Sequence, residues 1–157
     1  MKVAILLVAL LVLVSGCAQE AVKKQGEAFG ANIPAAWRQV TVGQNRVYEI
    51  TAGASIDVKV VDTVLKDVES AFSKVVSYYE SFDGYKVIEA KKTAKLGDLD
   101  ALTATVDFLP VEGYGKRAKL VVAFKDGKYY SAVYSAAQGE FYAYLPQVDG
   151  VLASFVV

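Results

Sequence analysis

The side chains that most often carry out chemistry in proteins are scarce in this chain. Among its 157 residues there is no histidine and a single cysteine, Cys17. Without histidine, the chain lacks the commonest general base and the commonest neutral metal ligand. Ser-His-Asp and Cys-His catalysis are therefore excluded, as are zinc sites that use histidine. Carboxylate-only hydrolysis and a calcium or magnesium site built from oxygen ligands remain open.

Cys17 ends a segment that has the features of an export signal. Lys2 is followed by an unbroken apolar run over residues 3–14 and then by Ser15-Gly16-Cys17. The run is too short to span a bilayer, which needs about 20 residues, and this arrangement is typical of a secretory signal peptide. Val14-Ser15-Gly16-Cys17 also resembles the lipobox of bacterial lipoproteins, in which the peptidase cuts before the cysteine and the sulfur carries a diacylglycerol. The alternative is an ordinary signal peptide that happens to end near a cysteine.

We therefore expect residues 1–16 to be a lipoprotein signal peptide and Cys17 to be the lipidated residue. The acyl chains would anchor the protein on the extracytoplasmic face of a membrane, the outer membrane if the organism has one. With Cys17 lipidated, no thiol nucleophile remains, and no disulfide can form within the chain because it has no other cysteine.

Four acidic residues that cluster in the sequence could line a cation site: Asp57, Asp62, Asp67 and Glu69. Carboxylate oxygens are the ligands that calcium and magnesium prefer. The simpler interpretation, which we favour, makes Asp62 the N-cap of a helix and makes Asp67 and Glu69 solvated charges near its first turn. We therefore expect no metal and no cofactor.

Five of the ten tyrosines fall near the C-terminus, on the last hairpin and the approach to the last helix: Tyr129, Tyr130, Tyr134, Tyr142 and Tyr144. Tyrosine is enriched at protein interfaces, so these residues are a candidate interaction surface. Tyrosine is also a good strand residue, and we favour the alternative that they simply belong to a sheet.

Basic residues form two small groups, at successive turns: Lys91, Lys92 and Lys95, then Lys116, Arg117 and Lys119. If the groups are neighbours they would attract an acidic partner; lysines that protect an edge strand are the alternative that we favour. The chain carries 17 basic and 17 acidic residues, so it lacks the basic excess of a nucleic-acid-binding protein.

The elements that position these residues can be predicted from hydrophobic periodicity. Short strands are expected over residues 38–42, 47–51 and 55–61, the last with Asp57 and Lys59 pointing outward. From residue 64 to residue 79 the apolar residues recur every three or four positions, which predicts an amphipathic helix.

The second half of the chain predicts four strands and a closing helix. The strands are expected over residues 85–93, 99–109, 118–124 and 128–136, with Asp126-Gly127 as a two-residue hairpin turn. Phe141, Leu145, Val148, Leu152 and Phe155 form the apolar stripe of the helix. Because proline suits a first turn, Pro146 places the start of this helix near Leu145. The fold class is therefore α+β, an antiparallel sheet packed with two amphipathic helices.

Several segments of this arrangement resemble the PsbP/DcrB-like family: Ile33-Pro34-Ala35-Ala36-Trp37, the helix after the third strand, Gly97-Asp98-Leu99-Asp100-Ala101, the strand over 128–136, Phe141, and Val151-Leu152-Ala153-Ser154-Phe155. The resemblance covers about residues 31–157. It implies a PsbP-like α/β/α sandwich that is exported and often lipid-anchored. These motifs mark packing and turns rather than chemistry, so the resemblance implies a fold and no particular activity.

Together these features predict a signal peptide over residues 1–16, the lipidated cysteine and a flexible tether over 17–32, and one α+β domain over 33–157. No serine lies in a Gly-x-Ser-x-Gly context and no glycine-rich phosphate loop is present. We therefore expect a non-catalytic binding or assembly module, held at the cell envelope by Cys17, with another envelope protein as partner. The alternatives are a carrier of a small apolar ligand and a carboxylate-dependent enzyme.

Overall fold

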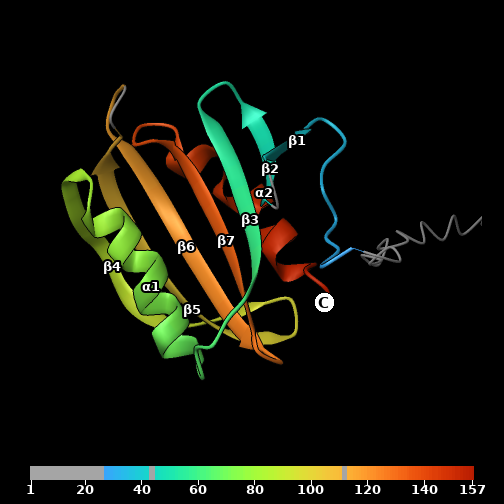
Figure 1. Cartoon of the computed structure of the whole chain (residues 1–157). Coiled ribbons are helices and arrows are strands. Elements are labelled where there is room, and N and C mark those ends of the chain that lie inside the picture. The colour runs from blue at the N-terminus through green and yellow to red at the C-terminus, as the bar shows by residue number, and fades with distance from the viewer. Residues whose placement is uncertain (1–26, 43–44, 111–112) are drawn as a thin grey trace, which may run out of the picture.

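A single antiparallel sheet of seven strands forms the centre of the fold (Figure 1). The computed structural model describes residues 27–42, 45–110 and 113–157, so the predicted signal peptide and Cys17 lie outside the described residues. The strand order across the sheet is β1-β2-β3-β7-β6-β5-β4. The strands are β1 (Arg38–Val42), β2 (Asn45–Thr51), β3 (Ala54–Asp62), β4 (Asp83–Leu96), β5 (Leu99–Leu109), β6 (Lys116–Lys125) and β7 (Lys128–Ala137).

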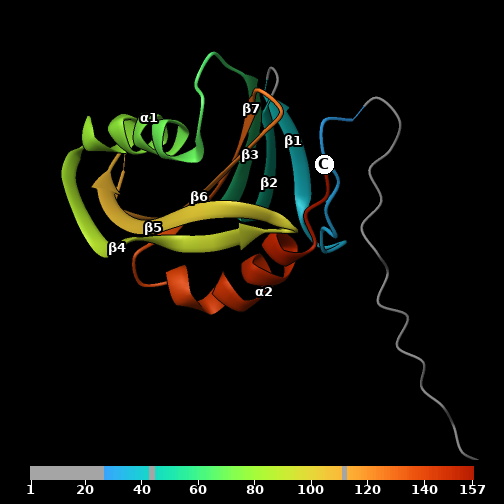
Figure 2. The same ribbon diagram turned by 90° about the horizontal axis from the view of Figure 1, so that it is seen from below.

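Two helices pack on opposite faces of this sheet, α1 (Val68–Glu80) and α2 (Phe141–Ala153) (Figure 2). Successive residues of a strand point to opposite faces, and β5 alternates in this way. Leu102 and Val106 belong to the core under α1, which we call the α1-side core, whereas Ala101 belongs to the core under α2, the α2-side core. The layers are therefore helix, sheet and helix, as the predicted α+β sandwich requires. No helix among the described residues is long and apolar enough to cross a membrane.

The helix α1 begins four residues later than the periodicity predicts. Its N-cap is Asp67, whose carboxylate accepts a hydrogen bond of 2.7 Å from the backbone N–H of Ser70. This hydrogen bond lowers the pKa of Asp67. The prediction that Asp62 is the cap is wrong: Asp62 ends β3 and lies 3.4 Å from the ammonium of Lys128. Val64, expected on the apolar face of the helix, is instead 95% exposed.

The helix α2 begins at Phe141, four residues before the predicted start, and Pro146 lies inside it. An interior proline costs about 3 kcal/mol because it removes a helical hydrogen bond. Phe141 offsets this cost, since it is buried, stacks on Tyr134 with 4.9 Å between ring centroids, and accepts a 2.8 Å hydrogen bond from the Tyr134 hydroxyl through its carbonyl. Burial of a phenylalanine contributes about 1.5–3 kcal/mol and a hydrogen bond about 1 kcal/mol more.

The folded part of the chain begins before residue 33, where the tether was expected to end. Phe29 is buried in the α2-side core and stacks on Phe155, with 4.8 Å between ring centroids. Gly30 pairs with Val156 through two backbone hydrogen bonds of 2.9 Å. Both figures show this N-terminal segment beside the C-terminus. Phe155, expected within the last helix, lies beyond its C-cap, where it can reach Phe29.

Gly97 joins the β4–β5 turn to the end of α2. Its φ is +56°, and its N–H donates a 2.8 Å hydrogen bond to the carbonyl of Leu152. A Cβ at this position would lie 1.7 Å from the carbonyl oxygen of Phe155. Only glycine therefore allows the turn to approach the backbone that follows α2 this closely.

We predict that Gly97→Ala destabilises the protein more than Gly127→Ala does. Both glycines have positive φ, so each alanine costs about 1–2 kcal/mol in backbone strain. At Gly127 the new methyl group would meet nothing within 4 Å, whereas at Gly97 it would collide with Phe155. Urea unfolding of the two variants checks the order, and equal losses would contradict the close approach.

Candidate functional site

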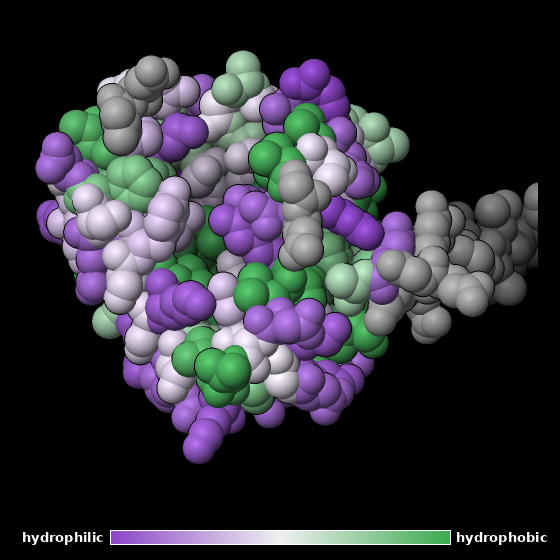
Figure 3. All heavy atoms as spheres, in the orientation of Figure 1, coloured by the Kyte–Doolittle hydropathy of each residue, from purple (hydrophilic) through white to green (hydrophobic). Residues whose placement is uncertain are grey.

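A pocket of about 210 Å³ lies where α1 leaves the sheet partly uncovered. The helix packs mainly on β6 and β5, so the margin of the sheet at β7 and β3 remains accessible beside it. The pocket is lined by charged and hydroxyl side chains together with aromatic and aliphatic ones: Asp57, Lys59, Lys74, Ser131, Tyr78, Tyr79, Tyr129, Val75 and Val133. Figure 3 shows this face of the molecule, on which hydrophobic and hydrophilic residues lie side by side.

The strand register places the polar side chains of β3 and β7 in this pocket. Asp57 pairs with Val133, and Lys59 pairs with Ser131, across the antiparallel ladder. Paired residues share a face, and the period of two brings Asp57 and Lys59 to the same side. Their outward orientation was predicted, since Ile56 and Val58 fill the α2-side core. The position of α1 above them was not, and it turns an expected solvent-facing surface into a pocket.

Asp57 is the electrostatic centre of the pocket. Its Oδ1 is buried and accepts no hydrogen bond from any described residue, while its Oδ2 lies 3.5 Å from the Nζ of Lys59. Burial raises the pKa of Asp57, and the charge and hydrogen bonding of Lys59 offset only part of that effect. An acceptor left without a donor is rare inside proteins, and such an atom calls for an explanation.

The helix contributes a second ammonium and two hydroxyls. Lys74 lies over the ring of Tyr129, with 5.9 Å between its Nζ and the ring centroid, and it forms no ion pair with any described residue. Burial raises the pKa of the Tyr79 hydroxyl, and the negative charge of Asp57 raises it further by a smaller amount. The hydroxyl is therefore protonated at neutral pH. Tyr78 lines the pocket with 59% of its surface exposed, and its ring packs edge to face against the ring of Tyr79.

The five tyrosines proposed as an interaction surface do not share one. Tyr129 faces the α1-side core and lines the pocket, whereas Tyr130 and Tyr134 are buried in the α2-side core, because neighbouring strand residues alternate between faces. Tyr144 lies on α2 and is half-buried against the α2-side core, and Tyr142, also on α2, is exposed. The five tyrosines therefore lie on both faces of the sheet, and Tyr129, Tyr130 and Tyr134 are strand residues, as in the alternative that we favoured. The sequence did not point to Tyr78 and Tyr79, because Tyr79 belongs to the apolar stripe of the predicted helix and no pattern distinguishes Tyr78 from its exposed neighbours.

The four clustered acidic residues separate in the folded protein. Asp67 caps α1, Asp62 lies near Lys128, and Glu69 binds the ammonium of Lys91 at 2.6 Å. Only Asp57 lines the pocket. Within residues 27–42, 45–110 and 113–157, no group of three or more carboxylates, histidines or cysteines lies close enough to hold a metal ion.

Members of the two basic groups do become neighbours, and all of them except Lys116 form ion pairs with described residues. Lys92, Lys95 and Lys119 line a second pocket, of about 290 Å³, between α2 and the sheet. Each of these lysines forms an ion pair, with Glu89, Asp100 and Asp149 respectively. Arg117 likewise donates two hydrogen bonds, of 2.7 and 2.9 Å, to Asp107. This pocket therefore lacks the free charge that would attract an acidic partner.

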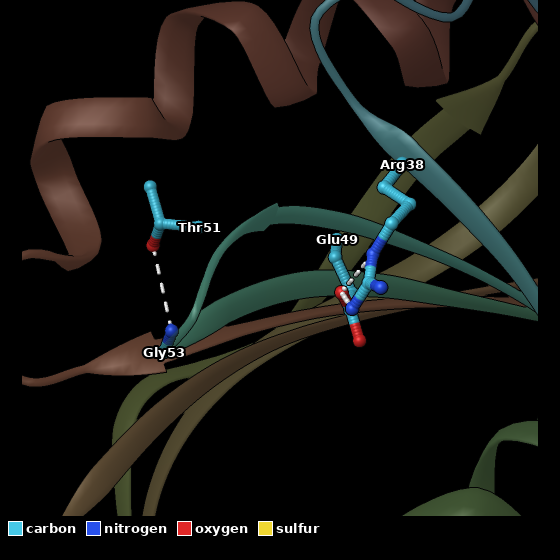
Figure 4. A network of polar contacts seen from close by, with 4 residues as sticks. All are labelled: Arg38, Glu49, Thr51 and Gly53. Atoms are coloured by element: carbon cyan, nitrogen blue, oxygen red, sulfur yellow. Dashed lines mark hydrogen bonds and ion pairs between the residues drawn. The ribbon is translucent and has the colours of Figure 1, made fainter.

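The outer strands carry a further ion pair. Arg38 of β1 and Glu49 of β2 are opposite one another in the register and bond through the guanidinium (Figure 4). In the following turn the N–H of Gly53 lies 3.5 Å from the hydroxyl of Thr51. Arg38 is 75% exposed, and an exposed pair of this kind contributes little to stability.

Several solved structures share this fold at low sequence identity. LpqN of Mycobacterium tuberculosis, described as involved in cell envelope biogenesis, aligns with a TM-score of 0.64 and 15% identity over 84% of this chain and 86% of its own. The cyanobacterial PsbP protein (CyanoP) of Synechocystis sp. PCC 6803 aligns with a TM-score of 0.60 and 15% identity over 94% and 98%.

A mutant of the protein Mog1 aligns with a TM-score of 0.54 and 13% identity over 86% of each chain. Comparisons with protein-family models and with curated protein sequences found no match. The similarity therefore shows that the chain has a PsbP-like and Mog1-like fold, and it does not carry function from one protein to another.

We predict that Asp57→Asn stabilises the protein at neutral pH by up to about 1 kcal/mol, because the amide removes the partly buried charge, whose cost solvent screens in part. Because the folded pKa of Asp57 is raised, its ionisation opposes folding. This penalty is fully present above the folded pKa and disappears as the pH falls to the ordinary value of 3.8.

Unfolding in urea at a series of pH values measures the effect. The stability advantage of Asp57→Asn should shrink as the pH falls. Asp98→Asn, at an exposed turn position outside the pocket, is the control and should leave stability unchanged at neutral pH. A less stable Asp57→Asn variant at neutral pH would show that the carboxylate is satisfied in the folded protein.

Proposed function

We propose that this protein is a lipid-anchored, extracytoplasmic binding module, and that it binds a component of the cell envelope through the pocket between α1 and strands β3 and β7. Cys17 is the proposed attachment point, because it follows the apolar run and the small residues of a lipoprotein signal. An envelope protein is the proposed partner. The PsbP-like fold and the role that LpqN is described as having in cell envelope biogenesis support this setting.

The observation that carries the proposal is the lining of the pocket. Small-molecule sites are concave and combine apolar walls with a few convergent polar groups, and titratable groups with shifted pKa values cluster at such sites. Here Val75 and Val133 supply apolar walls, Lys74 and Ser131 supply donors, and the part-exposed carboxylate of Asp57 supplies an acceptor.

The two alternatives fit this lining less well. Glycoside hydrolysis by carboxylates uses two of them on either side of the scissile bond, and Asp57 is the one carboxylate that lines the pocket. A carrier of an apolar molecule would need an apolar cavity, whereas this pocket exposes charged groups from both β3 and α1. A binding role accounts for the polar groups of the pocket and does not require a second carboxylate.

We predict that Cys17→Ser abolishes stable membrane attachment. A lipidated cysteine carries two or three acyl chains, whereas a single chain gives marginal, reversible binding. Serine offers no sulfur for the diacylglycerol, so the variant should be released from membranes or remain as uncleaved precursor. Fractionation of cells that express each form checks this. Mature Cys17→Ser protein in the membrane fraction would contradict the proposed anchor.

Photo-crosslinking in intact cells tests the binding role of the pocket. A photoreactive amino acid in place of Tyr78, which is 59% exposed at the pocket, should capture an envelope component. The same amino acid in place of Tyr142 is the matched control, because Tyr142 is 54% exposed on α2, across the sheet. Identical products from both positions, or products from Tyr142 alone, would contradict the assignment.

A further inference from the structure

The two edges of the sheet differ in how well they are protected against pairing with another strand. At one edge, β4 shifts its register with β5 at three places, and it carries four lysines: Lys86, Lys91, Lys92 and Lys95. Lysines and such irregularities are common protection for an edge strand. At the opposite edge, β1 over residues 38–42 has neither lysine nor proline, and its register with β2 is unbroken.

The free edge of β1 is open to a further strand. Within the part of the chain that the structure describes, no backbone hydrogen bond joins β1 to any element other than β2. Four of its five residues are exposed, and Val40 at its centre is half-buried. The segment that leads into β1 packs instead on the α2-side core, through Phe29, Ile33 and Trp37. An added strand at this edge would continue the sheet by backbone hydrogen bonds.

The sequence of β1 is complementary to itself in the antiparallel direction. When two copies pair about Val40, Arg38 of one copy lies opposite Val42 of the other, and Gln39 lies opposite Thr41. No like charges are opposed, and the two polar residues lie side by side. Val42, which is 59% exposed in the single chain, packs along the aliphatic stem of Arg38. Valine and threonine also favour the extended backbone of a paired strand.

This pairing suits two copies that are anchored in one membrane. Two antiparallel strands of one sheet are related by a two-fold axis perpendicular to the sheet, so both α2 faces lie on the same side. Phe29, from which the chain leads back to Cys17, packs in the α2-side core. The residues from Cys17 to Phe29 span at most about 40 Å, whereas the layer formed by a helix is about 10 Å thick. Both anchors can therefore reach a membrane beyond α2.

Building on the proposed function, we propose that this protein forms a two-fold dimer at the membrane, in which β1 pairs with β1 of a second copy about Val40. A single ladder of five residues is a small interface, which is typical of weak pairs. The lipid anchor offsets this weakness because it raises the effective concentration of the copies. The two pockets beside α1 then face away from the membrane, with their β3 strands five strand spacings, or about 24 Å, apart.

Cysteine crosslinking in cells that express the full chain tests this pairing. Cys17 is the only cysteine of the chain and is the proposed acylation site, so the unsubstituted chain is the blank. Val40→Cys should form a disulfide-linked dimer under mild oxidation, because opposite Cβ atoms lie about 5 Å apart. A chain with both Gln39→Cys and Thr41→Cys should do the same. These two positions are exposed, so they tolerate substitution.

Two positions that are more exposed than Val40 serve as controls. Val42→Cys would lie opposite Arg38 and about 13 Å along the strand from its own counterpart, too far for a disulfide. Val87→Cys lies on β4, the protected edge, where Val87 is 49% exposed. Neither should form a disulfide-linked dimer, although random collision would link both more readily than Val40→Cys.

Charge substitutions at Val42 in the Val40→Cys chain test the register. Val42→Lys places a like charge opposite Arg38 twice in each dimer and should weaken the pairing about tenfold. Val42→Glu places an opposite charge there and should preserve or strengthen the pairing. Because Val42 is 59% exposed, both variants keep the fold.

Three results would overturn the inference: no disulfide from Val40→Cys or from the Gln39 and Thr41 pair, as much disulfide from Val87→Cys as from Val40→Cys, or equal effects of Val42→Lys and Val42→Glu. With any of these, protein that remains in the membrane fraction and crosslinks through the Tyr78 position leaves the proposed function standing. Loss of the Tyr78 crosslinks with intact Val40→Cys dimers would instead contradict the proposed partner and leave the pairing standing.

Discussion

The structure depends on an unequal match between one wide sheet and two short helices. A helix about 10 Å in diameter covers two or three strands that lie about 4.8 Å apart, whereas this sheet has seven. On one face α2 is assisted by the segment around Phe29 and Trp37 and by Phe155, so the α2-side core extends across to β2 and β3. On the other face α1 has no such assistance, and the α1-side core reaches no further than Val61 at the end of β3.

The polar residues of β3 lie where the cover provided by α1 ends. Asp57 and Lys59 would be ordinary solvent-facing residues on an open sheet, but beside α1 they are partly enclosed with Lys74 and Tyr79. Enclosure removes water from the Asp57 carboxylate without supplying a donor to Oδ1. Retaining a charge at such a position lowers stability, and a loss of this kind is typical of binding sites, where stability is exchanged for function.

The sequence predicts most of the fold because local patterns and tertiary structure agree there. The strand over 99–109 matches β5 at both ends, and Asp126-Gly127 has the two positive φ values that a tight hairpin turn requires. The helix starts could not be predicted in this way. The Asp67 cap competes with an equally suitable Asp62, and Pro146 argues against a start that the packing of Phe141 on Tyr134 enforces.

The candidate site was not predicted, although its β3 residues were placed correctly. Periodicity shows that Asp57 and Lys59 share a face, but it does not reveal which element covers that face. The contact of Phe29 with Phe155 was missed for a similar reason, since the two residues lie at opposite ends of the folded chain and neither segment indicates the other. Both cases depend on long-range packing, which no local pattern encodes.

The pKa of the Asp57 carboxyl, followed by NMR titration, tests the account most directly. In the free protein the account predicts a pKa above the ordinary value of 3.8, because burial leaves Oδ1 without a donor. A pKa at or below the ordinary value would show that the carboxylate is satisfied in the folded protein and would contradict the account.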